Sequence, residues 1–139
     1  MTDTIYALST SPGRAGIAVV RISGPDAFLS LKSMSKDIQI KPRKTILCDL
    51  FTKEGLHLDR ALVISFKGPN SFTGEDVVEL HIHGSIAVIQ KTLETLSKIS
   101  NFRQALPGEF TRRALLNEKL NLAEIEGLAD LIEAETEAQ

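Results

Sequence analysis

The clearest pattern of hydrophobic and polar positions in this chain is a strict alternation over residues 77–83. In a strand, successive side chains point to opposite faces, so the apolar and polar residues of this segment separate onto two sides. The apolar set is Val78, Leu80 and Ile82, and the polar set is Glu79, His81 and His83. The segment therefore predicts a strand that covers the core with one side and lines up a carboxylate and two imidazoles on the other.

Shorter apolar runs predict four further strands, and apolar residues at helical spacing predict helices between them. The expected strands are residues 5–8, 17–22, 45–51 and 60–66, the last two forming a hairpin around a turn at 53–55. The expected helices are residues 25–33, 85–98 and 111–117. Strands with segregated helices are typical of α+β folds. We therefore expect an α+β domain with a mixed or antiparallel sheet of about five strands and helices packed on it.

Residues 122–139 follow a different pattern. Their apolar residues recur at helical spacing in a wide stripe, and no capping glycine or turn follows them. Such a helix either continues into further chain or docks on a partner. We expect a sheet domain over residues 1–119 and the start of a truncated helical domain over residues 120–139.

Composition narrows the class of protein. The chain has 139 residues, 42% hydrophobic and 24% charged, which suits one folded domain rather than a disordered segment. The formal net charge of −2 gives no overall basic footprint, and the basic clusters at 41–44 and 112–113 are expected to be solvated charges.

No segment is long and apolar enough to span a membrane, and no signal peptide begins the chain, so a soluble protein is expected. Cys48 is the one cysteine and is expected to be a buried thiol, which suits a reducing compartment.

Three interpretations of the polar strand side remain open. Glu79, His81 and His83 are possible zinc ligands, but three same-face strand positions span about 13 Å. In the second interpretation, this side of the strand is simply exposed to solvent and has no binding role. In the third interpretation it lines a small-molecule pocket, because a carboxylate can accept two hydrogen bonds from a flat ring with adjacent N–H groups.

Two further charged residues are candidates for a site. Arg21 lies in the apolar strand 17–22 and needs an anionic partner, which is either an internal carboxylate or a ligand. Lys119 lies between the short helix and the terminal one, where most lysines are simply exposed. The sequence contains no G-x-x-x-x-G-K-[ST] loop and no dinucleotide fingerprint. We therefore expect no self-contained catalytic machinery.

Five ordered motifs identify a resemblance that covers essentially the whole chain. They are Ser11–Gly16, Val20–Pro25, Pro69–Leu80, Pro107–Thr111 and Leu116–Leu120. Together they resemble the N-terminal region of the tRNA modification GTPases of the MnmE/TrmE family. Ala15 and Ser85 stand where this family usually has glycine.

The resemblance implies that the chain is a fragment. Family members continue into a helical domain with an inserted GTPase domain, so GTP, magnesium and potassium would bind only in that missing part. The N-terminal domain is similar to the tetrahydrofolate-binding domains of one-carbon enzymes, and the resemblance implies that it binds 5-formyltetrahydrofolate and forms a homodimer. Carried over by motif, the folate contacts fall on Arg21, Glu79 and Lys119.

For the full-length protein, the resemblance implies a cytoplasmic tRNA-modifying GTPase. It would work with a flavin-dependent partner protein and install a carboxymethylaminomethyl-type group at C5 of the wobble uridine of certain tRNAs. Two rival hypotheses remain: a metal-dependent enzyme that uses Glu79, His81 and His83, and a purely structural dimerisation module.

Overall fold

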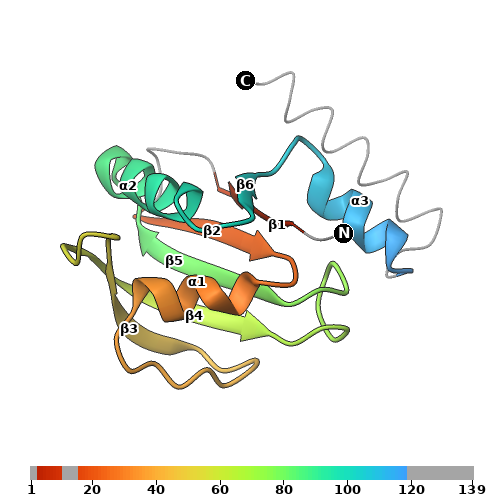
Figure 1. Cartoon of the computed structure of the whole chain (residues 1–139), viewed down its shortest axis with the longest axis horizontal. Helices are drawn as coiled ribbons and strands as arrows, with labels where there is room; N and C mark the ends of the chain where they lie inside the picture. The colour runs from red at the N-terminus through yellow and green to blue at the C-terminus, as the bar shows by residue number, and fades with distance from the viewer. Residues whose placement is uncertain (1–2, 11–15, 119–139) are drawn as a thin grey trace.

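The computed structural model describes residues 3–10 and 16–118 as six strands and three helices (Figure 1). The strands are β1 (Thr4–Leu8), β2 (Ile17–Ser23), β3 (Ile46–Phe51), β4 (His57–Phe66), β5 (Val77–His83) and β6 (Phe102–Gln104). The helices are α1 (Ala27–Met34), α2 (Ile86–Ser97) and α3 (Glu109–Leu116). Residues 120–139, expected to begin a helical domain, lie outside the described part of the chain.

The strands form one mixed sheet in the order β3-β4-β5-β2-β1-β6. Neighbouring strands are antiparallel except for β1 and β6, which are parallel. The expected α+β class is therefore confirmed. The sheet has six strands where the sequence predicted about five, because β6 has three residues and is too short to show an alternating pattern.

Helices α1 and α2 cover one side of the sheet, and no helix of the described residues covers the middle of the other side, which we call the open side (Figure 1). The buried side of β5 contributes Val78, Leu80 and Ile82 to the core, as the alternation predicted. Leu31 of α1 and Leu96 of α2 pack into the same core. The middle of the sheet is thus fixed by apolar packing on one side, while the polar residues of β5 lie on the other.

Helix α2 begins where β5 ends, and a serine cap marks the change. Ser85 precedes the first helical residue, and its Oγ accepts a hydrogen bond from the backbone N–H of Val88 at 3.2 Å. This hydroxyl satisfies one of the backbone donors that a helix start leaves without a partner. Ser85 is therefore the N-cap of α2.

Cys48 differs from its prediction. It lies on β3, which is an edge strand, and its side chain is half-buried rather than buried. An edge strand has a neighbour on one side only, so its side chains keep more solvent contact than those of central strands.

Among the described residues, no helix has the length and apolarity needed to cross a membrane.

Candidate functional site

Arg21 and Glu79 form an ion pair on the open side of the sheet. The antiparallel pairing of β2 and β5 places the two residues directly opposite each other. The Nε and Nη2 atoms of Arg21 both donate to Oε2 of Glu79, at 3.1 and 3.0 Å. Of the two partners considered for Arg21, the structure thus contains the internal carboxylate. The side chains are 30% and 20% exposed, so solvent reaches this pair.

His81 extends the pair to a group of three side chains. Its Nε2 lies 3.2 Å from Oε1 of Glu79, the oxygen that Arg21 does not contact. Nη1 of Arg21 makes no hydrogen bond to another residue in the described part of the chain. The group Arg21–Glu79–His81 therefore combines an oriented carboxylate with a guanidinium donor that is still available.

The third polar residue of β5 belongs to a different contact. Nδ1 of His83 lies 2.7 Å from Oδ1 of Asp59, and the backbone N–H of His83 donates to Oδ2 of the same carboxylate at 2.8 Å. Because strand residues four apart lie far from each other along the backbone, His83 and Glu79 do not converge. Across residues 3–10 and 16–118, no three His, Cys, Asp or Glu side chains are grouped to hold a metal ion. The zinc interpretation of Glu79, His81 and His83 therefore has no geometric support.

Apolar side chains surround the Arg21–Glu79–His81 group on the open side. In the register of the sheet, Ile64 lies beside Glu79, and Val19 and Leu62 lie on either side of His81. Several apolar residues of this side are well exposed for their type: Ile17 is 54%, Leu47 53% and Leu62 41% exposed. A small polar group set within an exposed apolar surface suits a ligand or partner with flat apolar faces and a polar edge.

Two parts of the predicted site cannot be compared with the structure. Lys119 lies outside the described residues, and so does most of the turn before β2, residues 11–15. The structure therefore brings together Arg21 and Glu79, and adds His81 as a contact of Glu79. From the sequence, His81 was considered as a zinc ligand, and the folate contacts carried over by motif did not include it.

A second charged cluster, which the sequence analysis missed, lies at the end of the sheet under α3. Arg113 was expected to be a solvated charge, but it is 0% exposed. Its guanidinium contacts Asp3 at 2.7 Å and Glu75 at 3.1 Å, and it donates to the backbone carbonyl of Asp3 at 2.9 Å. A buried charge of this kind requires such partners. The only sequence signal was its position on the polar side of a short helix, which exposed arginines share.

The buried arginine links α3 to β2. Glu75 accepts a hydrogen bond from the hydroxyl of Ser23 at 2.8 Å, and Ser23 lies two residues after Arg21 on β2. Arg113 thereby joins the 69–80 and 107–111 motifs to the strand that carries Arg21. Hydrogen bonding to Arg103 lowers the pKa of both Asp3 and Glu109 below their ordinary values, and Arg113 lowers them further.

Comparison with known proteins gives a result that agrees with these motifs. The sequence profile described as GTP-binding protein TrmE N-terminus matches residues 4–119. The chain belongs to this family. The match to the TrmE N-terminal family spans all nine described elements, from β1 to α3, and so includes the strands that carry Arg21 and Glu79.

Relatives of the TrmE N-terminal family match the whole of this chain. A protein named tRNA modification GTPase MnmE from Parvibaculum lavamentivorans is 58% identical over 139 residues, covering 99% of this chain and 32% of the relative. A protein of the same name from Roseobacter denitrificans is 53% identical over 137 residues, again covering 99% and 32%. The chain thus spans about a third of the length of the curated relatives it matches.

Proposed function

We propose that this chain is the folate-binding and dimer-forming N-terminal part of a tRNA-modifying GTPase. The observation that carries the proposal is the Arg21–Glu79 pair on the open side of the sheet, at the positions where the motifs predict folate contacts. Lys119 is proposed as a third contact, on the motif alone. The ligand is 5-formyltetrahydrofolate or another one-carbon tetrahydrofolate.

The chemistry of the pair suits the edge of a pterin ring. A carboxylate can accept two parallel hydrogen bonds from adjacent N–H groups, as the pyrimidine part of a pterin presents them. Arg21 donates to Oε2 of Glu79 through Nε and Nη2, which orients the carboxylate. His81 holds Oε1 at 3.2 Å, a contact long enough for a better donor to replace it. The surrounding apolar side chains would pack against the faces of the ring.

The open side of the sheet also supports dimerisation. Ile17, Leu47 and Leu62 expose apolar area on the same side as the Arg21–Glu79 pair. Burying this area against a second copy of the chain would be favourable, at about 25 cal/mol per Å² of apolar surface. A dimer formed there would also close the ligand site against water.

The remaining functions belong to the longer protein. Relatives are named as GTPases, and we propose that GTP, magnesium and potassium bind in the two thirds of their length that this chain does not span. In the full protein, the folate would supply a one-carbon unit for modification at C5 of the wobble uridine. That reaction would take place in the cytoplasm, together with a flavin-dependent partner protein.

Calorimetric titration of the purified chain with 5-formyltetrahydrofolate tests the folate site. Glu79→Gln keeps the size of the side chain but removes its charge, and it should weaken binding by about 2–5 kcal/mol. The matched control is Asp49→Asn. Asp49 lies on β3, and its Oδ1 is 3.0 Å from Nε2 of His57, so it is also a carboxylate paired with a histidine. Thermal unfolding of each variant verifies that it is folded.

The outcomes separate the hypotheses. Binding by the parent and by Asp49→Asn, with loss in Glu79→Gln, supports the proposed site. Equal binding by all three proteins would place the folate away from Glu79 and reject the site. If no protein binds but the chain is dimeric in sedimentation experiments, the dimerisation module is the better description of these residues.

A further inference from the structure

Positive charge is concentrated in one stretch of this chain. Residues 27–48 contain five of the 16 Lys and Arg residues but one of the 18 Asp and Glu residues. The stretch therefore has a formal net charge of +4, and the rest of the chain has −6. Such an asymmetry is invisible in the total of −2, which is why the overall charge gave no indication of a polyanion partner.

The five cations lie on α1 and on the segment that follows it, and we call them the basic surface. They are Lys32, Lys36, Lys41, Arg43 and Lys44, and all five are exposed. Lys32 lies in the last turn of α1, and Lys36 follows two residues after the helix ends at Met34. The segment then runs outside α1 toward the edge strand β3 (Figure 1). The basic surface thus lies on α1 and beside the edge strand β3, whereas the Arg21–Glu79 pair lies on the inner strands β2 and β5.

The turn that carries three of these cations is held in a fixed shape. The backbone N–H of Arg43 donates to the carbonyl of Ser65 at 2.6 Å, and that of Lys44 donates to the carbonyl of Lys41 at 3.2 Å. The guanidinium of Arg43 lies 5.9 Å from the ring centre of Phe66. Lys41 and Lys44 form no ion pair with a residue in the described ranges, so their charges are available to an external anion.

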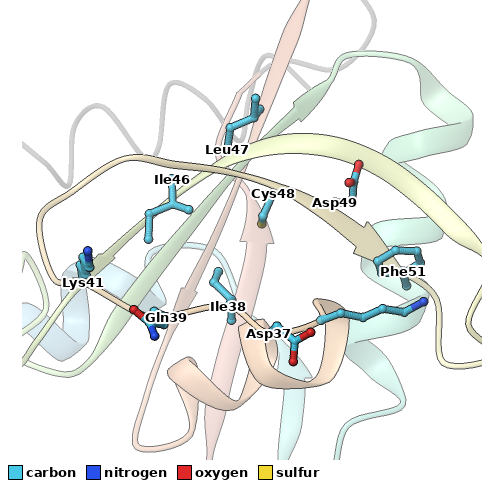
Figure 2. A pocket seen from close by; sticks show the side chains of 10 residues that line it. Asp37, Ile38, Gln39, Lys41, Ile46, Leu47, Cys48, Asp49 and Phe51 are labelled. Atoms are coloured by element: carbon cyan, nitrogen blue, oxygen red, sulfur yellow. The ribbon is translucent and has the colours of Figure 1, made fainter.

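A depression of about 550 Å³ lies between this segment and β3. Figure 2 shows Ile46 and Cys48 pointing from β3 toward Ile38, with Lys41 and Gln39 at one end. Two carboxylates, Asp37 and Asp49, also line it, and Asp49 is paired with His57. The depression gives the basic surface a concave border with a mixed apolar and polar lining.

We infer that the basic surface binds the phosphate backbone of RNA. The inference rests on the proposed function, because the curated relatives are named for tRNA modification. Several exposed cations on a firmly held segment, with few carboxylates among them, are what phosphate-backbone contacts require. Because the basic surface lies on α1 and on the segment beside the edge strand β3, while the Arg21–Glu79 pair lies on the inner strands β2 and β5, RNA and folate can occupy the chain together.

The test compares two double variants with the same change in net charge. K41Q/K44Q removes two cations of the basic surface, and K53Q/K91Q removes two exposed lysines elsewhere, from the β3–β4 turn and from α2. Neither pair makes a side-chain ion pair with a described residue. Fluorescence anisotropy would measure the binding of a labelled tRNA transcript, unmodified at its wobble uridine, between about 50 and 200 mM salt.

The expected result is a change in the salt dependence of RNA binding. The logarithm of the RNA association constant falls linearly with the logarithm of the salt concentration. Each lost phosphate contact makes this negative slope shallower by about 0.7–0.9, so K41Q/K44Q should make it shallower by about 1.4–1.8. K53Q/K91Q should leave the slope within about 0.5 of the parent value. Equal slopes for the two variants, or no RNA binding by the parent chain, would overturn the inference. So would equally tight binding of polyglutamate with the same response to K41Q/K44Q, because the partner would then be an acidic protein.

Folate titration of the same proteins distinguishes the two proposals. K41Q/K44Q should bind 5-formyltetrahydrofolate like the parent chain. If folate binding is normal and K41Q/K44Q does not change RNA binding, the proposed RNA-binding role of the basic surface is rejected and the folate site is retained. If the RNA effect is present without folate binding, the folate site fails and the basic surface stands.

Discussion

Two donors of Arg21, Nε and Nη2, converge on a single oxygen of Glu79, and the other oxygen faces His81. This arrangement fixes the carboxylate without using all of its capacity to accept hydrogen bonds. A partly exposed ion pair in the middle of an open sheet side contributes little to folding, since solvent screens it. Its geometry is compatible with the ligand contact proposed above.

A double-mutant cycle with Arg21→Gln and Glu79→Gln separates these two roles. In urea unfolding, the coupling energy between the two residues should be about 0.2–1 kcal/mol, as measured for other exposed pairs. In folate titrations, each single variant should lose more binding free energy than the coupling energy measured in urea unfolding. A coupling energy above about 3 kcal/mol in unfolding would instead identify the pair as a structural element.

Arg113 should behave in the opposite way. Arg113→Met removes the charge from a fully buried site, leaves the carboxylate of Glu75 without its arginine partner and leaves Asp3 paired with Arg103 alone. Breaking a buried ion pair on one side costs about 3–5 kcal/mol, so the midpoint of urea unfolding should fall sharply. Arg112→Met is the matched control, because Arg112 is its exposed neighbour in α3 and should change stability by less than about 0.5 kcal/mol. If both variants lost a similar amount of stability, the loss would come from a general perturbation of α3 rather than from removal of the buried charge.

The carboxylates near Arg103 predict a loss of stability in acid. The pKa values of Asp3 and Glu109 are lowered in the folded chain, first of all by hydrogen bonds to Arg103. Groups with a lowered folded pKa stabilise the fold above their unfolded pKa, about 4, and this contribution disappears as the pH falls through the folded pKa. The melting temperature should therefore change little between about pH 7 and 5 and then decrease toward pH 3.

Arg103→Gln tests this assignment. The variant should melt at a lower temperature than the parent at pH 7, and the two curves should approach each other below about pH 4, where both carboxylates take up protons. Lys98→Gln serves as a control, because it removes exposed contacts with Glu54 and Glu94. Parallel curves for the parent and Arg103→Gln over the whole range would show that the acid sensitivity arises from other groups.

Gly24 is predicted to be intolerant of any side chain. Its φ is +150°, and an added Cβ would lie 2.6 Å from the Cα of Thr4. Because the obstacle is backbone, it cannot rotate away, and Gly24→Ala should destabilise the chain by at least about 1–3 kcal/mol. Gly16→Ala is the matched control, since a Cβ at Gly16 meets no atom within 4 Å. Equal unfolding midpoints for the two variants would contradict this account.

The parts of the structure that the sequence predicted are those with local causes. The alternation in residues 77–83 matched β5 at both ends, because one of its sides is covered by helices and the other is open. The sequence left an internal carboxylate or a ligand as the partner of Arg21 and did not identify Glu79, because their pairing depends on the register between β2 and β5 and the two residues are 58 apart in the chain. Arg113 was misassigned for the same reason: Asp3 and Glu75, its partners, come from distant segments.

The position of β1 has a consequence for how the chain is made. This first strand lies between β2 and β6, so one of its edges receives a partner from residues 102–104, which are synthesised nearly a hundred residues later. Asp3 likewise can form its ion pairs only after Arg103 and Arg113 have been synthesised. Contacts of such long range slow folding and leave strand edges exposed in the meantime. A nascent chain that emerges from the ribosome therefore has an unprotected β1 edge until β6 has followed it out.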